Sequence, residues 1–155
     1  TKVSGEELFK MFYRLYGLET VAFRYFNVYG DRQPTSGQYA PVVGLFQKQF
    51  DEGLPFTVIG DGLQSRDFTH VSDVVEANMK AAFTEDKRAF AEVFNVGAGK
   101  NHTVMDLIKM IGGEDAFHIA MPERPGEARH SKADTSKAKE ILKWEAKVSL
   151  EDWLK

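Results

Sequence analysis

Three short segments of the chain place amide, guanidinium and carboxylate groups at the ends of expected strands and turns. Asn27 directly follows the apolar stretch 20–26, which reads as a strand, and Arg66 follows a glycine turn that begins at Gly60. Arg124 opens an Arg-Pro-Gly-Glu turn that ends at Glu127. Side chains beyond the carboxyl end of a parallel strand point into a ligand crevice. A guanidinium can hold a phosphate through two parallel hydrogen bonds, and a carboxylate can accept one from a sugar hydroxyl.

Each of these groups also has a purely structural interpretation. Taken alone, Arg66 is expected in a surface hairpin, where it pairs with a nearby acid such as Asp61 or Asp67. Glu127 would then be one more solvated carboxylate, because charged side chains usually lie exposed. The case for a ligand site therefore depends on the three segments being brought together.

The elements that position these groups alternate between helices and short strands. A possible Ser4–Glu7 capping box and a stop at Gly17 predict an amphipathic helix over residues 4–16, with Leu8 and Phe12 on its apolar face. Further helices are expected at 41–50, at 72–83 with Ser72 as its cap, at 136–142 and at 149–154. Another is expected at 103–112, where Thr103 with Asp106 gives a capping-box start. Short strands are expected at 56–59, 67–71, 93–96 and 117–120. This alternation favours an α/β fold.

The composition limits the possible functions. The chain has 155 residues, of which 43% are hydrophobic, enough for the core of one globular domain. A net charge of −3 without a basic stripe argues against a nucleic-acid partner. No apolar run approaches the roughly 18 to 20 residues that span a membrane. The absence of cysteine fits a cytoplasmic location, and the four histidines have no metal-ligand spacing.

Four ordered motifs extend over nearly the whole chain. They are RYFNVYG at 24–30, GDGLQSRDF at 60–68, FNVG at 94–97, and RPGE at 124–127 followed by ADTSKA at 133–138. In this order they resemble the C-terminal portion of the extended short-chain dehydrogenase/reductase family, in particular NAD-dependent nucleotide-sugar epimerases similar to UDP-glucose 4-epimerase. The resemblance implies the last strands and helices of a Rossmann-type parallel sheet, with a small mixed α/β substrate-binding domain. Residues 1–30 and 68–100 would complete the dinucleotide-binding domain, and residues 31–67 and 101–155 would form the substrate domain.

The resemblance also implies roles for single residues. Asn27 would donate its amide to the substrate, Arg66 and Arg124 would hold the two phosphates, and Glu127 would face the nucleotide ribose. Thr57 and Ile59 would line the base pocket and read a uracil-like ring through their backbone groups, although they could equally be plain edge-strand residues. The same resemblance places Gln38 and Tyr39 at the diphosphate and the nucleotide.

The start of the chain bears on catalysis. Lys2 matches the lysine of the family's Tyr-x-x-x-Lys motif; that lysine holds the nicotinamide ribose and lowers the pKa of the catalytic tyrosine. The family places this lysine inside the helix, so the resemblance predicts an earlier helix start than the Ser4 capping box, and the resemblance is preferred because helix boundaries are poorly predicted from local signals. That tyrosine would precede Thr1, and the sequence contains no glycine-rich fingerprint for NAD. Tyr25 and Phe26 would pass close to the nicotinamide, or they form a core aromatic pair. The chain as given is therefore not expected to be active alone.

The resemblance implies a parent enzyme that interconverts UDP-hexoses at C4 through a 4-keto intermediate, uses NAD and forms a homodimer. A 4,6-dehydratase or a decarboxylase of the same family, or a non-catalytic nucleotide-sugar-binding fragment, remain as alternatives. The open sheet edge that such a fragment would carry predicts pairing with another chain.

Overall fold

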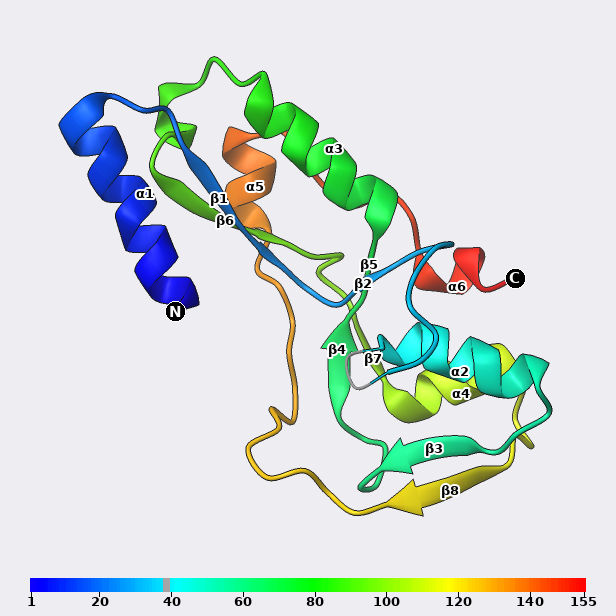
Figure 1. Cartoon of the computed structure of the whole chain (residues 1–155). Helices are drawn as coiled ribbons and strands as arrows, with labels where there is room; N and C mark the ends of the chain where they lie inside the picture. Colours follow the sequence, from blue (N-terminus) through cyan, green and yellow to red (C-terminus); the bar gives the residue numbers. More distant parts are fainter. Residues whose placement is uncertain (38–39) are drawn as a thin grey trace.

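The computed structural model describes residues 1–37 and 40–155, which form two groups of helices and strands joined by short strands (Figure 1). In the first group, β1 (Val21–Tyr25) pairs in parallel with β6 (Glu92–Val96). The helices α1 (Lys2–Tyr16), α3 (Val71–Ala82) and α5 (Ser136–Ile141) surround this pair, and a short 3-10 helix covers Lys87–Ala89. The parallel pair with helices around it confirms the predicted α/β class.

The core of the first group is built around aromatic side chains. Phe94 of β6 and Trp144 are both fully buried, and Val74 of α3 packs into the same cluster. The indole N–H of Trp144 donates to the backbone carbonyl of Asp73 at 2.9 Å, so the only polar atom of this side chain is satisfied inside the core. The C-terminal segment thereby fixes α3 against β6.

Helix α1 begins where the family resemblance places it, with Lys2 inside the helix. The later start suggested by the Ser4 capping box is wrong, because the N–H of Gly5 already donates to the carbonyl of Thr1 at 3.1 Å. The predicted end is confirmed, since Gly17 has φ +65° and its N–H donates to the carbonyl of Tyr13. No residue of α1 is buried, and its apolar side chains, such as Leu8, stay exposed.

The second group contains α2 (Val42–Asp51), α4 (Val104–Gly112), β3 (Phe56–Ile59) and β8 (His118–Met121). The strands β3 and β8 pair in parallel below the two helices (Figure 1). The core between them holds Phe46, Phe56 and Leu107, each at most 3% exposed. The expected start of α4 is confirmed by a complete capping box between Thr103 and Asp106.

Two short strand pairs and a terminal helix connect the groups. β2 (Val28–Tyr29) pairs in parallel with β5 (Thr69–His70), and β4 (Ser65–Asp67) pairs antiparallel with β7 (Asn101–Thr103). The last helix, α6, covers Leu150–Trp153. The predicted cap of α3 is wrong: His70 precedes the helix, and its Nδ1 accepts a hydrogen bond from the N–H of Ser72. Within the described ranges, no helix is long and apolar enough to cross a membrane.

Candidate substrate site

A cavity of about 730 Å³ opens where the two groups meet, a volume suited to a small-molecule ligand. Six of the eight residues that the sequence assigned to the substrate line it: Asn27, Thr57, Ile59, Arg66, Arg124 and Glu127. Four different segments contribute them: the end of β1, the strand β3, the strand β4 and the loop that follows β8. The other two, Gln38 and Tyr39, lie outside the described residues. The cavity thus collects side chains that are up to a hundred positions apart in the chain.

Arg66 on β4 forms an ion pair with Glu127, and both residues line this cavity. Its Nη2 donates to the carboxylate of Glu127 at 2.8 Å, and its Nη1 donates to the carbonyl of Ser65 at 2.9 Å. Neither Asp61 nor Asp67 is its partner, so the simple hairpin pairing is wrong. The geometry instead joins the arginine and the carboxylate that the sequence had assigned to one ligand.

The two acids near Arg66 have other partners. Asp61 makes a bidentate pair with Arg129 at 2.5 and 2.7 Å, and these hydrogen bonds lower the pKa of the Asp61 carboxyl to about 2. This pair ties the glycine turn before Arg66 to the end of the Arg124–Glu127 loop. Further along, the N–H of Ser65 donates to the carbonyl of Arg129 at 2.9 Å. These hydrogen bonds hold the end of the Arg124–Glu127 loop next to β4.

Arg124 completes the charged wall of the cavity. It is exposed, and it makes no ion pair with any residue in the described part of the chain. With Arg66 it supplies two guanidinium groups against the single carboxylate of Glu127. A net positive wall of this kind attracts a diphosphate, and the free fork of Arg124 can bind one without first breaking a bond.

Strand β3 lines the same cavity and leaves one of its two edges without a neighbouring strand among the described residues. The N–H of Phe56 donates to the carbonyl of Phe117, just before β8, and the N–H of Gly60, just after β3, donates to the carbonyl of Met121. Because successive residues of a strand direct their backbone groups to opposite edges, those of Thr57 and Ile59 face the other way. The edge that the sequence assigned to base recognition is therefore turned away from β8, and its residues line the cavity.

Asn27 stands between two cavities. Its backbone carbonyl accepts from the N–H of Thr69 at 3.0 Å, which fixes the chain where β1 ends. Besides lining the substrate cavity, Asn27 borders an open depression that also contains Tyr25 and Phe26. A ligand in the substrate cavity could thus reach the carboxyl end of β1 by passing this amide.

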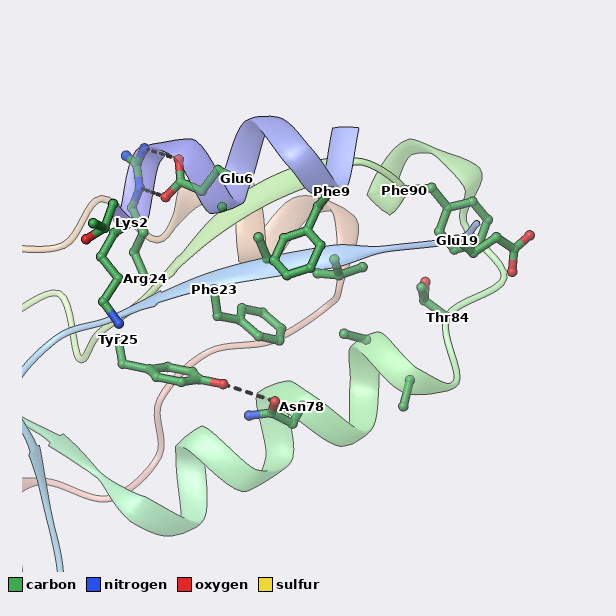
Figure 2. A pocket seen from close by; sticks show the side chains of 16 residues that line it. Lys2, Glu6, Phe9, Glu19, Phe23, Arg24, Tyr25, Asn78, Thr84 and Phe90 are labelled. Carbon is green, nitrogen blue, oxygen red and sulfur yellow. Dashed lines mark hydrogen bonds and ion pairs between the residues drawn. The ribbon is translucent and has the colours of Figure 1, made fainter. Parts of the chain in front are cut away.

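Lys2 lies in a separate cavity of about 870 Å³ between α1, β1 and α3. Figure 2 shows its amine directed toward Tyr25, whose hydroxyl donates to the side-chain carbonyl of Asn78 at 3.0 Å. Arg24 reaches back from β1 to α1 and makes a bidentate pair with Glu6, at 2.7 and 2.8 Å, which lowers the pKa of the Glu6 carboxyl. Lys2 and Tyr25 thus both line this cavity, whereas Arg66, Arg124 and Glu127 line the substrate cavity.

Sequence reasoning missed the buried carboxylate that supports the substrate site. Asp67 is fully buried and accepts from the N–H groups of Ala98, Gly99 and Ala133, at 2.7, 2.8 and 3.0 Å. In the glycine loop after β6, the N–H groups of Ala98 and Gly99 therefore donate to Asp67. An acid between Arg66 and an aromatic residue is the only local signal, and it does not reveal the partners.

Across the residues that the structure describes, no group of three histidine, cysteine or carboxylate side chains could hold a metal ion.

Comparison with known proteins gives concordant matches. Residues 1–97 match the sequence model of the NAD dependent epimerase/dehydratase family. A putative UDP-glucose 4-epimerase of Methanocaldococcus jannaschii is 36% identical over 158 residues, covering 100% of this chain and 50% of that protein. UDP-glucuronic acid decarboxylase 1 of Arabidopsis thaliana is 35% identical, covering 99% of this chain and 34% of that protein.

A solved structure agrees with these matches. The crystal structure of a UDP-glucose 4-epimerase from Thermotoga maritima, with UDP-glucose, is similar with a TM-score of 0.90 and 43% identity. The match covers 99% of this chain and 49% of that one. The chain thus spans about half the length, or less, of the proteins it matches.

Proposed function

The chain belongs to the NAD dependent epimerase/dehydratase family, and on this premise we propose that it forms the nucleotide-sugar-binding portion of a UDP-hexose 4-epimerase. The observation that carries the proposal is the convergence of Arg66, Arg124 and Glu127 with the open edge of β3 on one cavity. A UDP-sugar presents a base, a ribose, a diphosphate and a hexose in a row. The cavity offers a partner of matching chemistry for each.

In this proposal the two arginines hold the diphosphate, and Glu127 accepts from a ribose hydroxyl. Glu127 is already bonded to Arg66, so one carboxylate links the ribose and phosphate subsites. Asn27 directs its amide to the sugar at the end of β1. Interactions with the nucleotide are equally strong in the ground and transition states, so they retain the substrate while the hexose changes orientation.

The cofactor of the family is NAD, which when bound supplies hydride acceptance and return at C4 of the sugar. Lys2 fits such a group, because its amine faces an open cavity and is not consumed by an ion pair with the described residues. We assign Lys2 to the nicotinamide ribose, and Tyr25 and Phe26 to the neighbourhood of the nicotinamide ring. The division into residues 1–30 with 68–100, and 31–67 with 101–155, is the domain arrangement that this assignment requires.

Isothermal titration of the 155-residue chain with UDP, uridine, UDP-glucose and NAD tests the proposal. UDP and UDP-glucose are expected to bind, and uridine to bind more weakly because it lacks the phosphates. Arg124→Met is expected to raise the dissociation constant for UDP by about 10- to 100-fold, since a hydrogen bond to a charged group contributes roughly 1.5–3 kcal/mol. The same change should leave uridine binding nearly unaltered.

Arg88→Met is a matched control, because Arg88 is an exposed arginine paired with Asp86 and Glu140, outside the cavity. It removes the same charge and should change UDP affinity less than about twofold. Equal effects of the two substitutions, or no binding of UDP by the unaltered chain, would contradict the proposal.

The relatives named as decarboxylases favour a second candidate, a UDP-glucuronate decarboxylase. A decarboxylase of this kind needs a carboxylate at C6 of the hexose, whereas a 4-epimerase can act on either kind of sugar, since UDP-glucuronate 4-epimerases are also among the relatives. Titration with UDP-glucuronate beside UDP-glucose tests the decarboxylase. Clear preference for UDP-glucose would contradict it, and preference for the carboxylated sugar would keep it beside a UDP-glucuronate 4-epimerase.

A further inference from the structure

On the edge of β3 that faces away from β8, glutamine side chains bond to the first and the last backbone polar groups. Gln49 of α2 is 9% exposed; its Oε1 accepts from the backbone N–H of Thr57 at 3.2 Å, and its Nε2 donates to the Thr57 hydroxyl at 3.0 Å. Gln64, also 9% exposed, donates its Nε2 to the backbone carbonyl of Ile59 at 2.9 Å. The first and last polar groups of the edge are thereby occupied by the protein itself.

Between the two glutamines, one acceptor and one donor stay free. The carbonyl of Thr57 and the N–H of Ile59 point to the same edge, and neither has a hydrogen-bond partner among the residues that the structure describes. In a parallel ladder this pair would bind the N–H and C=O of a single residue of the next strand. The edge is therefore set to receive one N–H beside one C=O.

That pattern excludes an added strand and fits a planar ring. A peptide that extends a sheet needs a run of free backbone groups, and here the outer ones are already bonded. A pyrimidine that carries a ring N–H next to a carbonyl needs only one acceptor and one donor, which the Thr57 carbonyl and the Ile59 N–H supply. Both residues line the cavity that holds the arginines, so a base bound here would leave its ribose and phosphates on the charged side.

We propose that Gln49 and Gln64 are positioning residues that restrict β3 to one acceptor–donor pair and so set its preference for a base with an imide edge such as uracil. The inference rests on the proposed function, since it needs a nucleotide in this cavity. Gln49 is not among the described residues that line the cavity, so it acts through Thr57 and does not touch the ligand.

The test compares UDP with N3-methyl-UDP, in which the ring N–H is replaced, by titration of the full chain. The unaltered chain is expected to bind N3-methyl-UDP about tenfold more weakly or worse, because the Thr57 carbonyl loses its donor. Gln49→Met keeps a side chain of similar length in α2 but frees the N–H of Thr57. The base can then shift along the edge, and the discrimination between the two ligands should fall below about threefold.

Two further variants separate positioning from general destabilisation. Gln49→Glu retains an acceptor for the Thr57 N–H and another for its hydroxyl, and it should restore most of the discrimination. Gln47→Met removes an amide from the same helix whose oxygen accepts a hydrogen bond from Gln33 and which does not contact β3 through any hydrogen bond among the described residues; it should leave the discrimination unchanged. A loss of stability alone would lower the affinity for both ligands and would not alter their ratio.

The outcomes separate this inference from the function on which it rests. If the unaltered chain does not bind UDP, both are overturned. If it binds UDP and Gln49→Met keeps the tenfold ratio, the role of Gln49 is overturned while the nucleotide site stands. Binding of UDP and N3-methyl-UDP with equal affinity by the unaltered chain would overturn base reading by this edge.

Discussion

Replacing Asp67 with alanine is expected to lower the free energy of unfolding by about 3 kcal/mol. The carboxylate is fully buried, and it accepts three backbone hydrogen bonds of 2.7 to 3.0 Å. These bonds join β4 to the loop after β6 and to the segment at Ala133. Asp67 also follows Arg66 directly, so its loss disturbs the substrate cavity.

The magnitude follows from two opposing costs. Each N–H left unpaired costs about 1–3 kcal/mol, so three of them cost roughly 3–9 kcal/mol. Removing a carboxylate from a buried position recovers several kcal/mol of desolvation, and water that enters the vacated space pairs with some of the freed groups. The net loss of about 3 kcal/mol is a large fraction of the roughly 5–15 kcal/mol that stabilises a typical domain. For about 150 residues it corresponds to a fall in Tm of roughly 6–12 °C.

Urea denaturation followed by tryptophan fluorescence, to which Trp153 and the buried Trp144 both contribute, measures this loss. Asp67→Asn keeps one acceptor oxygen and should lose less than Asp67→Ala. Asp51→Ala provides the control, because Asp51 is exposed at the end of α2 and should change stability by less than about 0.5 kcal/mol. If the free energy of unfolding of Asp67→Ala lies within about 1 kcal/mol of that of the unaltered chain, the three hydrogen bonds do not hold these segments together.

Three more predictions concern packing, pH and association. Gly97→Ala should destabilise by about 1–3 kcal/mol, because a Cβ there would lie 2.3 Å from the Cβ of Ala133. Gly5→Ala, which meets nothing within 4 Å in a helix, should instead stabilise by about 0.5–1 kcal/mol in the same urea titration. Arg129 lowers the pKa of Asp61 from 3.8 to about 2, so the stability from this pair is complete above pH 4 and is lost as pH falls through 2. Asp61→Asn should therefore flatten the pH dependence of urea unfolding between pH 4 and 2, and an unchanged slope would contradict this account. Sedimentation should reveal concentration-dependent self-association along the open edge of β1, whereas a monomer at all concentrations would exclude it.

Features that depend on neighbours in the chain were predictable. The capping box of Thr103 and Asp106 and the left-handed stop at Gly17 use hydrogen bonds within one turn, and both are present as expected. The Ser4 capping signal misplaced the start of α1, whose first turn has no side-chain cap. The cap of α3 was wrong, because several residues near a helix end can satisfy the same N–H groups. His70 does so in place of Ser72.

The amino-acid sequence by itself determined the family, the α/β class and the residue types of the site, since ordered motifs and local turn chemistry are written along the chain. Only the tertiary structure decided which of those residues meet. Arg66 finds Glu127 at a separation of 61 positions, and Asp67 collects N–H groups from two distant loops. Gln49 reaches Thr57 from a helix whose polar face gives no sign of it. Such pairings depend on how helices and strands pack in space, and no local pattern encodes the distance between atoms so far apart in sequence.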